Sequence, residues 1–277
     1  MPPVLPGSVV KFLVSDPVGR RCAAEASEVL GWSVVDSYLE ASGEYSADAQ
    51  VLFVVHCLAV AGSVSCDYVV GPSFGGRAAA GFSGALSFAD TVWVTASLAS
   101  VVGEYFESAH SELVTVSFVR SSWGALAGVL AEMGGWWEVS CEVDSDFFMV
   151  SVESAWVEWL ARRVASVGGL CLYVMRPGMH ASVLGELRSL VDDCVLSRVG
   201  WGDPLVPLVS DADGGLVRSG EGVRGMLLDG FVRAVRWPAV VASLGGLGVS
   251  SLRVAGVDAL FGRVRCTTGA FEVTSLV

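Results

Sequence analysis

The stretch from Leu113 to Met175 constrains the fold more tightly than any other part of the chain. Apolar segments with the composition of strands occur at 113–119, 137–143, 147–152 and 170–175. Segments with the composition of helices occur at 123–133 and 155–167. The resulting order, β-α-β-β-α-β, is typical of a ferredoxin-like unit. The sequence therefore predicts a small ferredoxin-like subdomain at 113–178, inserted into a large α/β subdomain formed by 1–112 and 179–277.

A tight glycine turn lies ahead of this subdomain. The apolar run Asp67 to Val70 leads directly into the sequence GPSFGG at 71–76, and an Ala-rich helix is predicted from Arg77. A strand, a sharp turn that contains G-x-S-x-G and a helix together form the nucleophile elbow of α/β-hydrolase folds, which exposes the Ser hydroxyl. The sequence thus predicts an α/β-hydrolase-like large subdomain with Ser73 as nucleophile. An ordinary turn serine is the alternative.

A serine hydroxyl needs a base within hydrogen-bonding reach before it can attack a carbonyl. Of the three histidines, His180 follows the small subdomain in the loop sequence RPGMHA, and loops of this kind often carry reactive groups. His56 lies in a long apolar segment and is interpreted as a core residue. His180 is therefore the candidate general base, and an ordinary histidine at a helix start is the alternative.

The remaining elements complete the large subdomain. Strands are predicted at 9–14, 67–70, 205–209 and 251–255. Helices are predicted at 20–30, 49–61, 183–195, 223–231 and 237–244.

Charge and hydropathy exclude two classes of partner. The formal net charge of -12 at pH 7 argues against nucleic acid as the main ligand, because phosphate binding requires clustered cations. Hydrophobic residues make up 53% of the chain, yet its longest uncharged runs fall short of the roughly 18–20 apolar residues of a spanning helix. We therefore expect a protein without a membrane partner.

The seven cysteines are scattered, and no two of them form a C-x-x-C pair. Together with three histidines at unsuitable spacing, they predict no metal site. Free thiols predict a reducing intracellular compartment, either the cytoplasm or the mitochondrial matrix.

Several segments together resemble the acyltransferase family of fatty acid and polyketide synthesis, including malonyl-CoA:acyl carrier protein transacylases. The turn GPSFGGRAA at 71–79 is similar to the nucleophile turn of that family, and GALSFAD at 84–90 continues the likeness. The sequence VPLVSD at 206–211 is similar to its late strand, VRW at 235–237 to its V-x-W helix start, and 251–264 to the segment with its E-V-G-P-G motif. The inserted ferredoxin-like unit stands where the family has one. The chain is thus identified as a diverged member.

The resemblance implies a role for each matching residue. Ser73 would accept the acyl group, and His180 would be its general base. A backbone carbonyl, that of Ser210 or Asp211, would orient the imidazole. The backbone amide of Phe74 would form half of the oxyanion hole.

The chain departs from the family pattern at further positions. The G-Q-G-S motif, whose Gln amide completes the oxyanion hole, corresponds to the sequence SDPVG at 15–19. Pro17 has no N–H to donate, so the amide of Val18 is the remaining candidate. The Arg that grips a malonyl carboxylate corresponds to Leu98. Leu98 in the acyl pocket predicts a neutral acyl group, unless Arg77 or another Arg reaches the carboxylate.

Three functions remain open from the sequence. The first is transfer of an acyl group from acyl-CoA or a phosphopantetheine thioester through Ser73 to an acyl carrier protein, without a permanently bound cofactor. The second is a catalytically degenerate relative that serves as a structural or docking subunit of a larger assembly. The third is hydrolysis of the acyl thioester by the same Ser-His pair.

Overall fold

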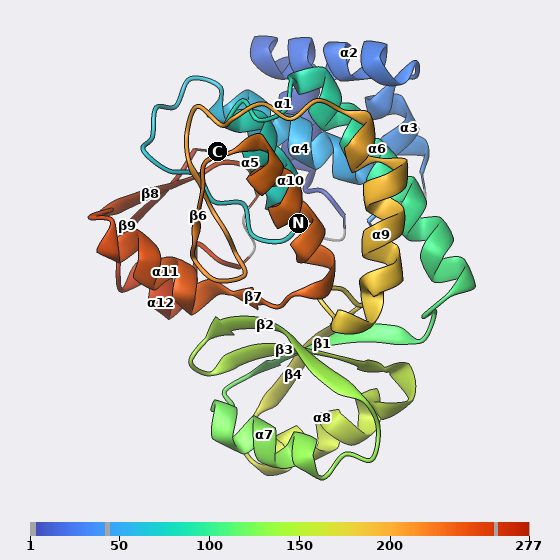
Figure 1. The fold of residues 1–277 in the computed structure, drawn as a ribbon, viewed down its shortest axis with the longest axis vertical. Coiled ribbons are helices and arrows are strands. Elements are labelled where there is room, and N and C mark those ends of the chain that lie inside the picture. Colours follow the sequence, from blue (N-terminus) through green and yellow to red (C-terminus); the bar gives the residue numbers. More distant parts are fainter. Residues whose placement is uncertain (1–3, 42–44, 258–259, 277) are drawn as a thin grey trace.

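The computed structural model describes residues 4–41, 45–257 and 260–276. Helices form its upper part in Figure 1, and a sheet with two helices forms its lower part. The lower part comprises β1 (Leu113–Val119), α7 (Trp123–Ala131), β2 (Trp137–Asp144), β3 (Phe147–Glu153), α8 (Val157–Ser166) and β4 (Leu170–Met175). The predicted order β-α-β-β-α-β is confirmed, and each strand begins at the predicted residue.

The lower sheet has the strand order β4-β1-β3-β2-β7, in which β1 and β3 are central. Its first four strands pair antiparallel. Val116 and Phe118 of β1 pack against Leu126 of α7 and Leu160 of α8, and all four side chains are fully buried. Alternate strand residues face this helix layer, which explains why the helices cover a single face of the sheet.

The fifth strand comes from a distant part of the chain. β7 (Val235–Arg236) pairs in parallel with β2, so that Val235 lies opposite Cys141 and Arg236 lies opposite Glu142. This pairing joins the C-terminal region directly to the ferredoxin-like sheet (Figure 1).

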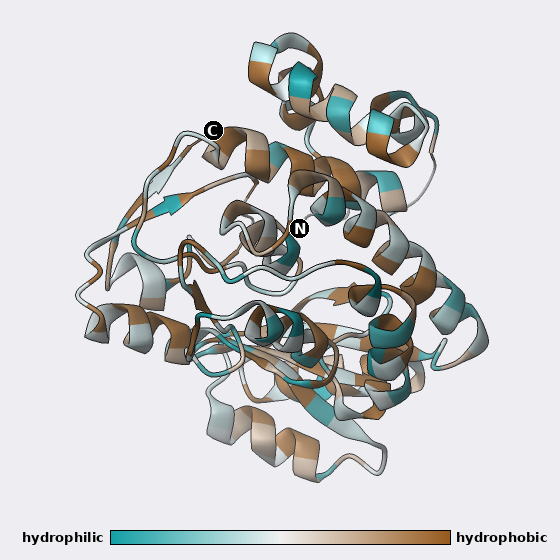
Figure 2. Cartoon of the chain, turned by 45° about the horizontal axis from the view of Figure 1, so that its top comes forward, coloured by the Kyte–Doolittle hydropathy of each residue, from teal (hydrophilic) through white to brown (hydrophobic). Residues whose placement is uncertain are grey.

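The upper part is mainly helical. Its helices are α1 (Gly7–Ser15), α2 (Pro17–Leu30), α3 (Val34–Glu40), α4 (Ala47–Ala61), α5 (Gly75–Phe82), α6 (Phe88–Ser108), α9 (Gly185–Cys194), α10 (Gly220–Val232), α11 (Trp237–Gly246) and α12 (Arg265–Thr268). Its strands are β5 (Leu208–Val209), β6 (Leu216–Val217), β8 (Ser251–Val254) and β9 (Glu272–Ser275). Hydrophobic residues dominate the inner helices in Figure 2, whereas the outermost helices mix hydrophobic and hydrophilic residues. The large α/β part thus encloses its core within helices.

The helix α4 lies at the centre of this core. It is apolar all round and has almost every residue buried, as expected of an interior helix. His56 of α4 is fully buried, and its ring packs edge-on against Phe12 at a centroid distance of 5.2 Å. The interpretation of His56 as a core residue is confirmed.

The predicted strand at 9–14 is wrong, because these residues lie in α1. Val9 and Leu13 are buried, while most of the residues between and around them are exposed. A spacing of four places both side chains on one helix face. The spacing of apolar residues in this segment fits either a strand or a helix. Its packing against α2 and α4 decides in favour of the helix.

Two short paired segments bring the residues that follow Val70 close to the residues that follow Val209. Val69 forms a parallel bridge with Leu208, and the Val209 N–H donates to the Val69 carbonyl at 2.9 Å. The predicted strand at 67–70 is thus reduced to one bridge, and the strand predicted at 205–209 is reduced to β5. Because parallel strands end at the same edge, the residues that follow Val70 and Val209 meet there.

The described residues contain no helix long and apolar enough to cross a membrane. All seven cysteines lie within the described part, and each is a free thiol. No cluster of three or more potential metal ligands occurs among the same residues.

Candidate functional site

Ser73 lies in the turn between the bridge at Val69 and the helix α5. The Gly75 N–H donates to the Pro72 carbonyl at 3.0 Å, and the Gly76 N–H donates to the Ser73 carbonyl at 3.1 Å. Ser73 adopts a φ of 53°, which is uncommon for a residue other than glycine. Its side chain is exposed. Strained backbone of this kind is typical of functional turns and presents the hydroxyl outward.

His180 meets Ser73 from a segment 107 residues further along the chain. Its Nε2 lies 2.8 Å from the Ser73 Oγ, within hydrogen-bonding distance. His180 also has a left-handed φ, 58°. The structure therefore brings together the two residues that the sequence proposed as nucleophile and base.

The ferredoxin-like sheet holds the His180 loop. The Met179 N–H donates to the Thr115 Oγ1 at 3.3 Å, and the Ser151 hydroxyl donates to the Met179 carbonyl at 3.2 Å. On the other side, the Ala181 N–H donates to the Phe231 carbonyl in α10 at 3.1 Å. The backbone on both sides of His180 is thus fixed.

Burial lowers the pKa of His180 below its usual value, while the negative charge of Asp211 and the carbonyls of Arg233 and Gly230 act in the opposite direction. Since the net shift is downward, the imidazole is neutral near pH 7 and Nε2 can accept a proton from Ser73. Nδ1 then carries the ring hydrogen. It is shielded from water and has no hydrogen-bond acceptor among the described residues.

The structure does not show the predicted orientation of His180 by the Ser210 or Asp211 carbonyl, because Nδ1 forms no hydrogen bond with any described residue. The Ser210 carbonyl accepts the Gly214 N–H at 2.8 Å, and the Asp211 carbonyl accepts the Arg236 N–H at 2.7 Å. The carbonyls of Gly230 and Arg233 face the ring instead. No local sequence signal identifies them, because their position depends on how the end of α10 packs against the His180 loop.

Asp211 contacts the nucleophile turn through its side chain. Its Oδ2 accepts the Ser73 N–H at 2.7 Å across a separation of 138 residues. Sequence reasoning assigned Asp211 only a carbonyl role and missed this contact. The parallel bridge between Val69 and Leu208 explains it, because both residues follow the carboxyl ends of paired strands.

The two predicted oxyanion donors lie in different environments. The Phe74 N–H donates no hydrogen bond within the described ranges and stands at the start of α5, where the helix dipole favours negative charge. The Val18 amide is not available, because it donates to the Asp16 Oδ1 at 2.8 Å at the start of α2. Asp followed by Pro is a helix-start signature, so the sequence did carry a signal against Val18.

Leu98 and Arg77 are the residues on which the predicted acyl preference depends. Leu98 is 2% exposed and belongs to an apolar cluster with Ala79 and Ala80 of α5. The Arg77 guanidinium donates to the Gln50 Oε1 at 3.0 Å and lies 4.4 Å from the centre of the Phe74 ring. Burial lowers the pKa of Arg77 to about 10, so it remains charged at pH 7.

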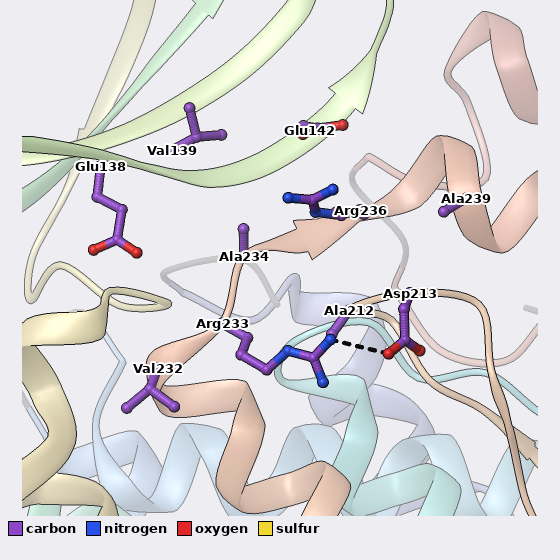
Figure 3. Close-up of a pocket in the computed structure, with 10 residues that line it drawn as sticks. All are labelled: Glu138, Val139, Glu142, Ala212, Asp213, Val232, Arg233, Ala234, Arg236 and Ala239. Atoms are coloured by element: carbon purple, nitrogen blue, oxygen red, sulfur yellow. Dashed lines mark hydrogen bonds and ion pairs between the residues drawn. The ribbon is translucent and has the colours of Figure 1, made fainter.

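A cleft of about 670 Å³ opens between the ferredoxin-like sheet and the end of α10 (Figure 3). Glu138 and Glu142 of β2 line it together with Arg236 of the adjacent strand β7. Arg233 is neutralised by Asp213 at 2.9 Å, whereas Arg236 forms no ion pair with any residue that the structure describes. The cleft adjoins the reactive pair through Ala212, which follows Asp211, and through Arg233, whose carbonyl faces His180.

Comparisons with known proteins agree with this architecture. Residues 117–175 match the family model of the VinK acyltransferase small domain. The malonyl-transacylase PlMCAT, solved with the type II polyketide synthase carrier protein AntF, superposes with a TM-score of 0.84 at 17% identity, covering 96% of this chain and 90% of that one. No curated protein matches the sequence.

Two bacterial enzymes give similar values. The malonyl-CoA:ACP transacylase of Synechocystis sp. PCC 6803 has a TM-score of 0.81 at 20% identity over 99% of this chain and 92% of that one. The transacylase of Coxiella burnetii has a TM-score of 0.84 at 16% identity over 99% and 90%. This chain therefore has the fold of the malonyl-CoA:acyl carrier protein transacylases, with a small domain of the VinK acyltransferase type.

Proposed function

We propose that this protein is an acyltransferase that moves an acyl group from a CoA or carrier-protein thioester, through Ser73, to the phosphopantetheine thiol of an acyl carrier protein. The 2.8 Å contact between Ser73 Oγ and His180 Nε2 carries this proposal. The two side chains come from distant segments, and both have strained backbone conformations. A fold that kept its shape without chemistry has no need of this arrangement.

The geometry supports a two-step transfer. Neutral His180 takes the Ser73 proton on Nε2 as Oγ attacks the thioester carbonyl, and the Phe74 amide meets the developing oxyanion. The C–S bond breaks, and the leaving thiol receives the proton from His180. The acceptor thiol then attacks the Ser73 ester and reverses these steps.

The acyl group of this proposal is neutral. Leu98 is apolar and buried at the position that corresponds to the carboxylate-binding Arg, and Arg77 is already engaged by Gln50 and the Phe74 ring. A carboxylate buried beside Leu98 alone has no cationic partner, and burial of an unpaired charge is strongly unfavourable. We also propose that 113–178 acts as the small subdomain against 1–112 and 179–277.

The experiment that tests the proposal uses a panel of acyl thioesters and intact-mass analysis of the protein. We expect a mass increase equal to one acyl group, with acetyl to butyryl thioesters reacting at least about 10-fold faster than malonyl, a ratio that corresponds to 1.4 kcal/mol. Faster reaction with malonyl thioesters contradicts a neutral substrate. In that case, loss of the malonyl preference in Arg77→Met identifies Arg77 as its partner.

The residues that line the cleft in Figure 3 support an acyl carrier protein as the acceptor. One of the matched solved structures is a transacylase in complex with its acyl carrier protein. The phosphopantetheine arm carries a phosphodiester, and Arg236 is a cation in the cleft without an ion-pair partner among the described residues. We assign Arg236 to this phosphate, since an Arg guanidinium binds phosphate oxygens through paired hydrogen bonds.

Charge reversal at Arg236 tests this assignment. We expect Arg236→Glu to raise the KM for the carrier protein about 10-fold with little change in kcat, because a favourable phosphate contact of roughly 1.4 kcal/mol is lost. Steady-state transfer to a phosphopantetheinylated carrier measures this effect. Arg162→Glu is the control, because Arg162 is exposed and its one ion pair within the described residues is with Glu158 on α8. An equal rise in KM in both variants contradicts a specific site.

Hydrolysis of the acyl thioester is distinguished in the same assay. Release of free acid without a carrier, at a rate comparable to transfer, identifies water as the acceptor. Absence of any acyl adduct across the panel favours the structural or docking role instead.

A further inference from the structure

Asp211 is a buried carboxylate without a cationic side-chain partner. It is 9% exposed, and it forms no ion pair within the ranges that the structure describes. Its Oδ2 accepts the Ser73 N–H at 2.7 Å. A buried negative charge is unfavourable unless something nearby compensates it, so the environment of Asp211 requires an explanation.

The first part of the explanation lies in the nucleophile turn. Ser73 is held at a φ of 53°, and such strain persists only where surrounding contacts fix it. A hydrogen bond from a backbone N–H to a carboxylate is stronger than one between neutral groups. The Asp211 backbone is itself fixed, because its carbonyl accepts the Arg236 N–H at 2.7 Å. Asp211 thus anchors the turn from a rigid position.

A positive charge forms on His180 during the reaction, close to Asp211. When His180 takes the Ser73 proton, its ring becomes a cation whose Nδ1 is shielded from water. Nδ1 faces carbonyls without a hydrogen bond to an acceptor among the described residues, so no carboxylate contacts the ring directly. Asp211 is the negative charge that acts on His180.

Most other charged and titratable groups near this site are engaged elsewhere, whereas Arg236 of β7 and Glu142 of β2 line the adjacent cleft and form no ion pair among the described residues. Arg233 is paired with Asp213 and Asp229, each at 2.9 Å. Glu138 of β2 accepts both the N–H and the hydroxyl of Ser182, at 2.8 and 2.7 Å. Cys141 of β2 is buried, and burial, together with the Asp211 and Glu142 charges, raises its pKa, so it stays a neutral thiol. Asp211 is therefore the carboxylate whose charge acts on His180, and it can stabilise the imidazolium.

We propose that Asp211 is a positioning residue for the acyl transfer, which fixes the Ser73 amide by a hydrogen bond and stabilises the His180 imidazolium through space. This inference rests on the proposed function of the Ser73 and His180 pair. Asp211 is then the third residue of the site, and its carboxylate contacts the nucleophile turn rather than the imidazole. The proton still passes only between Ser73 Oγ, His180 Nε2 and the leaving or attacking thiol.

Asp211→Asn separates the two roles. The amide oxygen of Asn can still accept the Ser73 N–H, whereas the negative charge is removed. We expect the plateau rate of acyl-enzyme formation to fall about 10-fold, and the half-maximal rate on the acidic limb to move to lower pH, since removal of a nearby negative charge lowers the pKa of an imidazole. Asp211→Ala loses both contributions, and we expect a fall of about 100-fold.

Single-turnover acylation across pH, followed by intact mass, measures these effects. Asp192→Asn is the matched control, because Asp192 pairs with Arg224 through Nε at 2.9 Å and Nη2 at 2.6 Å, and we expect its profile to follow the wild type. A purely structural role lowers the plateau in Asp211→Asn without moving the acidic limb, and that result overturns the proposal.

A second measurement keeps the inference separate from the proposed function. The pKa of the His180 ring can be followed by NMR titration, with its signals assigned by their loss in His180→Gln. A lower His180 pKa in Asp211→Asn than in the wild type supports the electrostatic role even if no thioester acylates the protein. An unchanged pKa refutes that role, whatever the activity.

Discussion

Ser73→Ala is expected to form no acyl adduct with any thioester and to reduce acyl transfer at least about 10³-fold, the scale seen when one member of a nucleophile-base pair is removed. The reason is geometric. Ser73 is the exposed hydroxyl in contact with His180, and alanine leaves the imidazole without a proton to take. Intact-mass analysis after incubation with the preferred thioester measures the adduct, and transfer to a carrier protein measures turnover.

Two variants sharpen this test. His180→Ala is expected to lose about as much as Ser73→Ala, and the double variant little more, because residues that act as a unit are not additive. Ser166→Ala is the control, since its exposed hydroxyl donates to the Arg163 carbonyl of its own helix. Full transfer by Ser73→Ala refutes the proposed mechanism. Intact biological function in a variant that forms no adduct assigns the chain to the structural or docking role.

Gly71→Ala is expected to destabilise the protein by about 3 kcal/mol, near the upper end of measured overpacking effects. A Cβ at position 71 would lie 2.1 Å from the Gly75 carbonyl oxygen and 2.3 Å from its carbon. Both atoms are backbone at the start of α5, so the nucleophile turn itself would have to move. Thermal unfolding should show a lower Tm by roughly 6–12 °C, together with loss of acylation.

Gly103→Ala provides the matched control for this substitution. Gly103 lies in α6, a Cβ there meets nothing within 4 Å, and its φ is not left-handed. Alanine in a helix interior is expected to stabilise by about 0.5–1 kcal/mol. A Tm for Gly71→Ala equal to or above that of Gly103→Ala contradicts the close approach of the turn to the strand that precedes it.

The local pattern of apolar residues and helix caps was sufficient to predict the strands and helices of the ferredoxin-like part. Both ends of β1 and the first residue of α7 were predicted correctly. The reason is that apolar runs of strand composition alternate here with helices that begin after a capping residue. Ser122 caps α7 by accepting the Ala125 N–H. The helix α2 was predicted from Arg20 and begins three residues earlier, at Pro17, with Asp16 as its cap. Where propensity, period and caps agree, the sequence specifies the element.

The secondary-structure prediction failed where a short apolar run fits both the two-residue period of a strand and the 3.6-residue period of a helix. The residues of α1 read as a strand, and only packing against α2 and α4 shows that Val9 and Leu13 share one buried helix face. Val18 was matched to the oxyanion position from the motif at 15–19, and its amide instead donates to Asp16 at the start of α2. A segment of six residues does not contain enough turns to distinguish the periods by itself.

The sequence by itself determined the order of strands and helices along the small domain and the glycine turn that carries Ser73, and it singled out His180 as the candidate base. Only the tertiary structure decided that the Asp211 side chain holds the Ser73 amide, that the Gly230 and Arg233 carbonyls face the imidazole, and that Arg236 remains unpaired in the described cleft. The physical reason is sequence separation. Elements form from neighbours a few residues apart, whereas these contacts join segments up to 138 residues apart, and their register is set by strand pairing and helix packing.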